Sequence, residues 1–172
     1  MYTHQVFSVR FFVCGMLCRF GLTMKKVTLL LLFILTFGFG QTNVSGIISS
    51  NTTWAALSSP YIVTGSVLVN EGVTLTIQAG VEVKFDAGTG IVVSGTLIAQ
   101  GTNSDQITFT SNESSPSAGD WSNLSFTNTS GDAVFNNDGA YSSGSILEYC
   151  NVEYGSGIYL NLGNPFINHC TI

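Results

Sequence analysis

Residues 67–110 read VLVNEGVTLTIQAGVEVKFDAGTGIVVSGTLIAQGTNSDQITFT, and this stretch decides the fold. Short runs alternate apolar and polar residues, and turns containing Gly, Asn or Asp separate them at nearly constant intervals. Alternation with a period of two is the signature of β-strands that bury one face. β-Branched residues, which strands prefer, dominate the runs. The stretch therefore predicts a series of short strands joined by tight turns.

The pattern then repeats along the chain. Equivalent positions are Val67 and Ile91, Leu75 and Leu97, and Val83 and Phe109. Three short strands in a cycle of roughly 24 residues are typical of a solenoid whose coils stack on one another. The connections are too short for crossover helices, so equivalent strands must pair in parallel between coils. We expect an all-β protein, a parallel β-helix with three sheets along its axis.

The coils predicted for 67–172 are clearest at the end of the chain. Residues 147–152 align with 167–172, and residues 119–126 supply another inward-facing set. The pattern stops in mid-coil at Ile172, which exposes apolar surface and strand edges. We therefore expect the solenoid to be truncated at its C-terminal end, with further coils or domains of the same full-length chain beyond it. The expected inward residues are Trp121, Leu124, Phe126, Leu147, Cys150, Val152, Ile167, Cys170 and Ile172.

Two segments depart from the repeat. Residues 41–66 have a mixed pattern, and the first coil of a solenoid has no neighbour on one side. We interpret 41–66 as an N-terminal cap, with Trp54 as a large apolar plug. Residues 127–144 are polar and rich in Gly, Asn and Asp, which predicts a loop insertion that leaves one coil and returns to it.

The start of the chain is typical of a targeting segment. Lys25 and Lys26 precede the apolar run at 27–39, and small and then polar residues follow it. This layout predicts a cleaved secretory signal peptide at 24–40, because the run is well short of the roughly 20 residues that span a membrane. We interpret residues 1–23 as an over-extended N-terminus. The expected location is secreted, extracellular or on the outer surface, with no stable membrane span after cleavage.

Charge separates along the chain in the same way. Four of the five basic residues precede residue 27, and all ten acids lie at Glu71 or later. Without the leader, ten acids face the single lysine Lys84, a formal charge of −9. Such a surface repels phosphate backbones, which excludes nucleic acid as an expected partner.

Several motifs together resemble a known family. They are Trp54, PYIV at 60–63, VNEGVTLTI at 69–77, GVEVKF at 80–85, GTLIAQGT at 95–102 and ITFTS at 107–111. They resemble the N-terminal coils of secreted bacterial right-handed parallel β-helix repeat proteins of the pectin-lyase-like fold, and the resemblance covers about residues 44–172. It implies a right-handed solenoid. It implies no single function, because members include polysaccharide lyases, glycoside hydrolases, adhesins and uncharacterised surface proteins.

The catalytic groups implied by the lyases of this fold are a basic residue and acids that hold Ca²⁺. Only Lys84 and His169 offer a base after the leader, and Lys84 alternates outward beside Glu82, which favours a surface ion pair. Hydrolases need two clustered carboxylates, whereas most acids here stand in turn contexts. We expect no catalytic residue, no cofactor and no metal site, and at most weak Ca²⁺ binding at 136–139.

Cys150 and Cys170 form the one pair of cysteines after the leader. Export favours a disulfide. In-register parallel strands, however, hold Cβ atoms about 4.8 Å apart, farther than the roughly 3.8 Å of a disulfide. We expect stacked, reduced and buried thiols, with the disulfide as the alternative.

The functional expectation is a non-catalytic extracellular or cell-surface β-helix scaffold that serves as an adhesin, stalk or glycan-binding segment. The alternative is the N-terminal part of a secreted polysaccharide lyase or glycoside hydrolase whose active site lies on later coils. The expected partner is a polysaccharide or cell-surface glycan, because Trp54, Trp121 and Tyr141 are candidate residues for stacking on sugar rings.

Overall fold

The computed structural model describes residues 40–172, and their regular structure is almost entirely β-strand. The predicted over-extended start at 1–23 and the predicted signal peptide, up to residue 39, lie outside the described residues. Helical structure in the described part is limited to η1, a single 3-10 turn at Ala56–Ser58. No helix between residues 40 and 172 combines the length and the apolar character that crossing a membrane requires.

The strands form three faces. The first face is a five-stranded parallel sheet in the order β15-β12-β7-β4-β2. Its strands are β2 (Thr52–Trp54), β4 (Thr74–Ile77), β7 (Thr96–Gln100), β12 (Ile146–Glu148) and β15 (Phe166–Asn168).

The second and third faces belong to one eight-stranded sheet in the order β13-β8-β5-β3-β6-β9-β14, with β1 also paired to β3. The long strand β3 (Tyr61–Val69) joins them, because Tyr61–Val63 pairs with β5 whereas Val67–Val69 pairs with β6. The remaining strands are β1 (Thr42–Ile48), β5 (Glu82–Phe85), β6 (Ile91–Val93), β8 (Ile107–Ser111), β9 (Leu124–Phe126), β13 (Cys150–Val152) and β14 (Ile158–Leu160).

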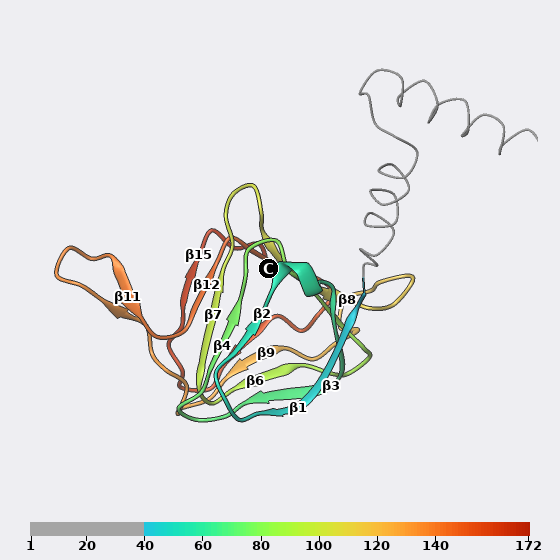
Figure 1. The fold of residues 1–172 in the computed structure, drawn as a ribbon, viewed down its shortest axis with the longest axis horizontal. Coiled ribbons are helices and arrows are strands. Elements are labelled where there is room, and N and C mark those ends of the chain that lie inside the picture. Colours follow the sequence, from blue (N-terminus) through green and yellow to red (C-terminus); the bar gives the residue numbers. More distant parts are fainter. Residues whose placement is uncertain (1–39) are drawn as a thin grey trace, which may run out of the picture. The chain divides into compact units, whose positions relative to one another are not determined.

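From β2 onward the chain visits the faces in a constant order, so each coil lies on the one before it. β4, β5 and β6 occupy the first, second and third faces, and β7, β8 and β9 repeat that order one coil later. Figure 1 shows the three faces as the sides of a triangle, seen nearly along the solenoid axis. This arrangement is the predicted parallel β-helix.

The strand register confirms the repeat predicted from the sequence. The aligned pairs are Val67 with Ile91, Leu75 with Leu97, Val83 with Phe109, and Leu147 with Ile167. Successive coils therefore stack without a slip at these positions. A slip of one position would turn each inward side chain to the solvent, so the buried face fixes the register.

The inward side chains fill the solenoid with a continuous apolar core. Phe85 and Trp121 are fully buried and stack with ring centroids 4.0 Å apart and an interplanar angle of 9°. Phe109 lies on Phe85 from the next coil, at 6.5 Å between centroids. Trp121 donates its indole N–H to the carbonyl oxygen of Glu153 at 2.8 Å, so its polar atom is satisfied inside the core. Of the inward residues predicted from the sequence, Ile172 departs most, because it is exposed at 66%.

The predicted cap at 41–66 is itself part of the stack. β1 and β2 pair in parallel with β3 and β4, as later coils pair with one another. The solenoid pattern therefore begins at Thr42, earlier than the predicted boundary at residue 67. Trp54 is buried in the core of this first coil, where it stacks on Tyr61 at 4.9 Å and lines an open pocket of about 350 Å³.

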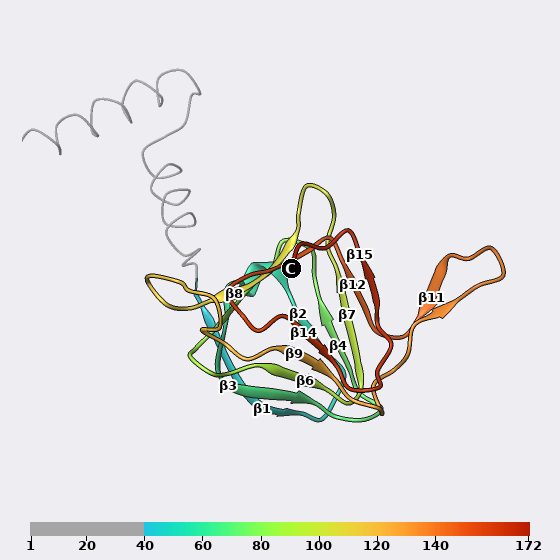
Figure 2. The same ribbon diagram turned by 180° about the vertical axis from the view of Figure 1, so that it is seen from behind.

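Residues 127–144 contain an antiparallel hairpin, β10 (Val134–Phe135) and β11 (Tyr141–Ser143). The hairpin projects from the corner between the third and first faces, as Figure 2 shows from behind. Two backbone hydrogen bonds, both 2.8 Å, hold its base: Gly131 N–H donates to Gly95 O, and Ser145 N–H donates to Gly131 O. These two bonds complete the coil at the point where the hairpin leaves it.

Candidate ligand-binding surface

Two of the three predicted sugar-stacking residues lie in the core. Trp54 is 3% exposed and Trp121 is 0% exposed, and each stacks on an aromatic neighbour from the solenoid interior. A buried ring has no face on which a sugar can stack. We therefore correct the prediction for Trp54 and Trp121, whose alternation places them with the inward apolar residues.

Tyr141 lies outside the core, in an aromatic cluster with Phe135 and Phe166. The ring of Phe166 stacks against Tyr141 at 6.2 Å and 14°, and meets Phe135 edge to face at 5.1 Å and 85°. Tyr141 donates its hydroxyl proton to Gly144 O at 2.7 Å, and partial burial raises its pKa. Phe135 remains 45% exposed. The cluster thus joins the hairpin to β15 and leaves apolar ring surface in contact with solvent.

Beside this cluster, a row of polar side chains crosses the strands on the outer surface of the first face. Glu148 accepts hydrogen bonds from the Gln100 amide at 3.2 Å and the Asn168 amide at 3.0 Å. The three residues occupy equivalent positions on β7, β12 and β15, one per coil. The register of the solenoid therefore builds a ladder of amide and carboxylate groups on its outer surface.

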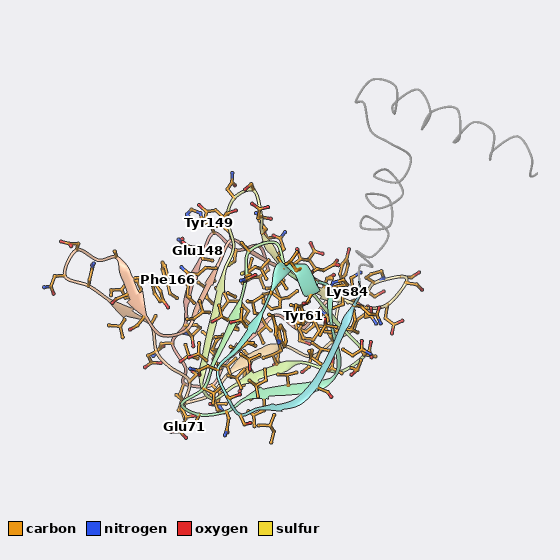
Figure 3. The ribbon with its side chains drawn as sticks, in the orientation of Figure 1. Tyr61, Glu71, Lys84, Glu148, Tyr149 and Phe166 are labelled. Atoms are coloured by element: carbon orange, nitrogen blue, oxygen red, sulfur yellow. The ribbon has the colours of Figure 1, made fainter. Side chains whose placement is uncertain are left out.

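Beyond the ladder, Tyr149 and His169 form a second aromatic group. Their rings stack at 4.6 Å and 11°, and the His169 side chain is exposed. Both residues have positive φ, 49° and 51°, which marks the same left-handed corner in two successive coils. Phe166 is the first residue of β15, and His169 directly follows the end of that strand. Three positions of extended chain place the two residues about 10 Å apart. Figure 3 shows Phe166, Glu148 and Tyr149 along this same side of the solenoid.

We define this side, with the aromatic cluster, the Gln100–Glu148–Asn168 ladder and the Tyr149–His169 stack, as the ladder flank. Aromatic rings flank hydrogen-bonding groups on it, a combination that suits a ligand with both apolar faces and hydroxyl groups. The sequence analysis identified Tyr141 as a candidate binding residue. It did not predict that Phe135, Phe166 and the Tyr149–His169 stack form one surface with it. The alignment of 147–152 with 167–172 predicted that Tyr149 matches His169, and only the folded-back hairpin adds Phe135.

Lys84, the base considered from the sequence, pairs with Glu82 on its own strand. Its ammonium nitrogen lies 3.5 Å from a Glu82 carboxylate oxygen, and both side chains are partly exposed. The pair lies on β5, on a different face from the ladder flank. The geometry agrees with the surface ion pair that the alternation predicts.

Replacing Lys84 with Gln is expected to change the free energy of unfolding by no more than about 0.5 kcal/mol, because exposed ion pairs contribute little. Urea unfolding followed by circular dichroism measures the change, with wild type as the reference. A loss above about 1 kcal/mol would contradict a surface role.

Most acidic side chains hold local structure. Asp120, for example, accepts hydrogen bonds from the Ser117 N–H at 2.9 Å and the Ser111 hydroxyl at 2.7 Å, and these donors lower its pKa. Asn136, in the segment considered for weak Ca²⁺ binding, accepts from the N–H groups of Asp138 and Ala140 and so closes the hairpin tip. Seven of the ten acids make side-chain hydrogen bonds or an ion pair: Glu82, Asp86, Asp105, Asp120, Asp132, Glu148 and Glu153. Within residues 40–172, no group of three or more His, Cys, Asp or Glu side chains is placed to hold a metal ion.

Comparison with known proteins gives a family match over most of the described chain. Residues 46–159 match the family model described as the pectate-lyase like beta helix domain. The matched range runs from within β1 to within β14 and includes the hairpin. No curated protein and no solved structure gives a significant match to the chain.

Proposed function

The chain belongs to the pectate-lyase-like β-helix family, and from that premise we propose that it is a non-catalytic, extracellular or cell-surface scaffold that binds glycan. The observation that carries the proposal is that most acidic side chains are engaged in structural contacts. Seven of the ten form structural contacts, mainly in turns and along the ladder, and the single lysine after the leader is paired. Side chains that stabilise the solenoid in this way support a role in presenting a binding surface rather than in transferring protons.

The ladder flank is the surface that we assign to the glycan. Rings at Phe135 and His169 offer apolar faces, and the Gln100 and Asn168 amides with the Glu148 carboxylate lie between them. The charge of −9 after the leader opposes binding of polyuronates, so a neutral polysaccharide is the expected ligand.

Binding can be tested on an array of neutral plant and algal polysaccharides, followed by titration calorimetry with the best ligand. Replacing Phe135 or His169 with Ala is expected to weaken binding about tenfold, which corresponds to ~1.4 kcal/mol. Tyr159→Ala is the matched control, because Tyr159 is 57% exposed on β14, away from the ladder flank. Equal losses in all three variants, or no binding to any polysaccharide, would contradict the assignment to the ladder flank.

The second candidate is the N-terminal part of a polysaccharide lyase or glycoside hydrolase, because the family description gives the β-helix domain and does not distinguish an enzyme from a scaffold. Incubation of the chain with polygalacturonate and with neutral polysaccharides separates the two functions. The scaffold proposal expects no unsaturated uronate product and no new reducing ends. Product release that survives removal of contaminating enzymes would overturn it, whether or not the ladder flank binds glycan.

A further inference from the structure

Cys150 and Cys170 lie one directly above the other in successive coils. The neighbouring pairs fix this register, because Glu148 aligns with Asn168 and Asn151 bridges to Thr171. Both cysteines are free thiols in this structure, and Cys170 is less buried than the sequence analysis expected. Each thiol donates to a backbone carbonyl oxygen of the preceding coil, Cys150 to Ala99 and Cys170 to Leu147.

The two thiols differ in access to solvent. Cys150 is 0% exposed, and its Sγ lies 3.4 Å from Ala99 O on the preceding coil. Cys170 packs at the edge of the core and is half-buried, with its Sγ 3.4 Å from Leu147 O. A reagent in solution therefore reaches Cys170 before Cys150.

We propose that Cys150 and Cys170 form a thiol–disulfide exchange site, in which Cys170 attacks a small-molecule disulfide and Cys150 resolves the product. The proposal is independent of the scaffold function. It rests on the register of the two coils and on the unequal exposure of the two thiols.

The reaction balances in two steps. The Cys170 thiolate attacks one sulfur of an external disulfide, RSSR; a Cys170–S–SR bond forms, the external S–S bond breaks, and RS⁻ leaves. Cys150 then gives its proton to a departing thiolate and attacks Cys170 Sγ, which displaces the second RS⁻. The external disulfide is reduced to two RSH, and the cysteine pair is oxidised to one disulfide.

The electrostatics of the pair give the same order of attack. The neighbouring Cys170 thiol raises the pKa of Cys150, and the neighbouring Cys150 thiol lowers the pKa of Cys170. Burial adds to the increase at Cys150, and the Glu148 carboxylate opposes ionisation of both thiols. Cys170 is therefore the first to form the thiolate, which is the nucleophile in thiol–disulfide exchange.

Disulfide closure requires a small movement of the coil that carries Cys170. In-register Cβ atoms about 4.8 Å apart must approach by roughly 1 Å to reach disulfide geometry. The product would join two successive coils covalently.

The test uses oxidised glutathione on the full chain, in a background with Cys14 and Cys18 replaced by Ser. Cleavage after glutamate separates the thiols, because Glu148 and Glu153 isolate Cys150 in peptide 149–153 and Cys170 in peptide 154–172. Mass spectrometry should find the two peptides disulfide-linked, with no glutathione retained. Cys150→Ser should stop with one glutathione on peptide 154–172, and Cys170→Ser should leave Cys150 unmodified.

Several results would overturn the proposal. One is a wild-type chain that keeps glutathione on Cys170 while Cys150 stays free. A second is modification of Cys150 in the folded Cys170→Ser variant. A third is the absence of any reaction in the folded wild type. A denatured sample of each variant controls for reagent activity, since every remaining thiol should then react. Circular dichroism of each variant confirms that the strands are intact before exchange is measured.

Discussion

Replacing Phe85 with Ala is expected to lower the free energy of unfolding by about 3–5 kcal/mol. The Phe85 ring is fully buried, stacks on Trp121 and contacts Phe109 from the next coil. Its removal leaves a cavity that the stacked strands cannot close, because hydrogen-bonded coils on both sides hold the backbone. Urea unfolding followed by circular dichroism measures the loss, which would be a large fraction of the stability of an ordinary domain.

Leu57→Ala serves as the control for Phe85→Ala. Leu57 is 94% exposed in η1, so its truncation is expected to change stability by less than about 0.5 kcal/mol. A Phe85→Ala loss below about 1 kcal/mol would show that the core relaxes around the missing ring, contrary to its close packing.

Gly95→Ala is the second substitution with a large expected effect. Gly95 turns the chain between β6 and β7, and a Cβ atom there would fall on the carbonyl oxygens of Asn70 and Val73 in the preceding coil. These atoms are backbone and cannot rotate away as a side chain could. Gly95 also accepts the Gly131 hydrogen bond at the base of the hairpin. We expect a loss of several kcal/mol in unfolding free energy, and on the order of 3 kcal/mol is the lower bound.

Gly65→Ala is the matched control for Gly95→Ala. Its added Cβ would meet only the Ser45 Cβ, at 3.3 Å, and no backbone carbonyl. Both variants lose the same glycine flexibility in the unfolded chain, so the difference between them isolates the clash. Equal stability of the two variants would contradict the close coil-to-coil approach at Gly95.

The solenoid could be predicted from the sequence because its determinants are local and repeated. Val67, Leu75 and Val83 each have an equivalent one coil later, and the structure pairs them with the predicted partners. Alternation fixes which side chains point inward, and stacking then fixes the register. The strands of each coil can therefore be predicted mainly from the residues of that coil and its neighbours.

The candidate site could be predicted only in part, because it depends on contacts that do not repeat. Phe135 reaches Phe166 only because the hairpin folds back against β15, a contact between segments that lie more than one coil apart in the sequence. Trp54 and Trp121 illustrate the opposite error. Their aromatic rings suggested sugar stacking, but the alternation that predicted Leu124 and Phe126 in the core includes Trp121 as well.

The closed base of the hairpin has an evolutionary consequence. Gly131 and Ser145 complete the coil through their own hydrogen bonds, and Asp132 and Ala133 bond to Asn164 of the next coil, so the length of chain between 134 and 143 does not enter the stacking of the strands. Insertions and deletions within 134–143 then cost mainly loop-closure entropy, about 0.6 kcal/mol for each doubling of length. Natural selection can therefore exchange this segment, and the aromatic surface it brings to the ladder flank, while the solenoid beneath it remains unchanged.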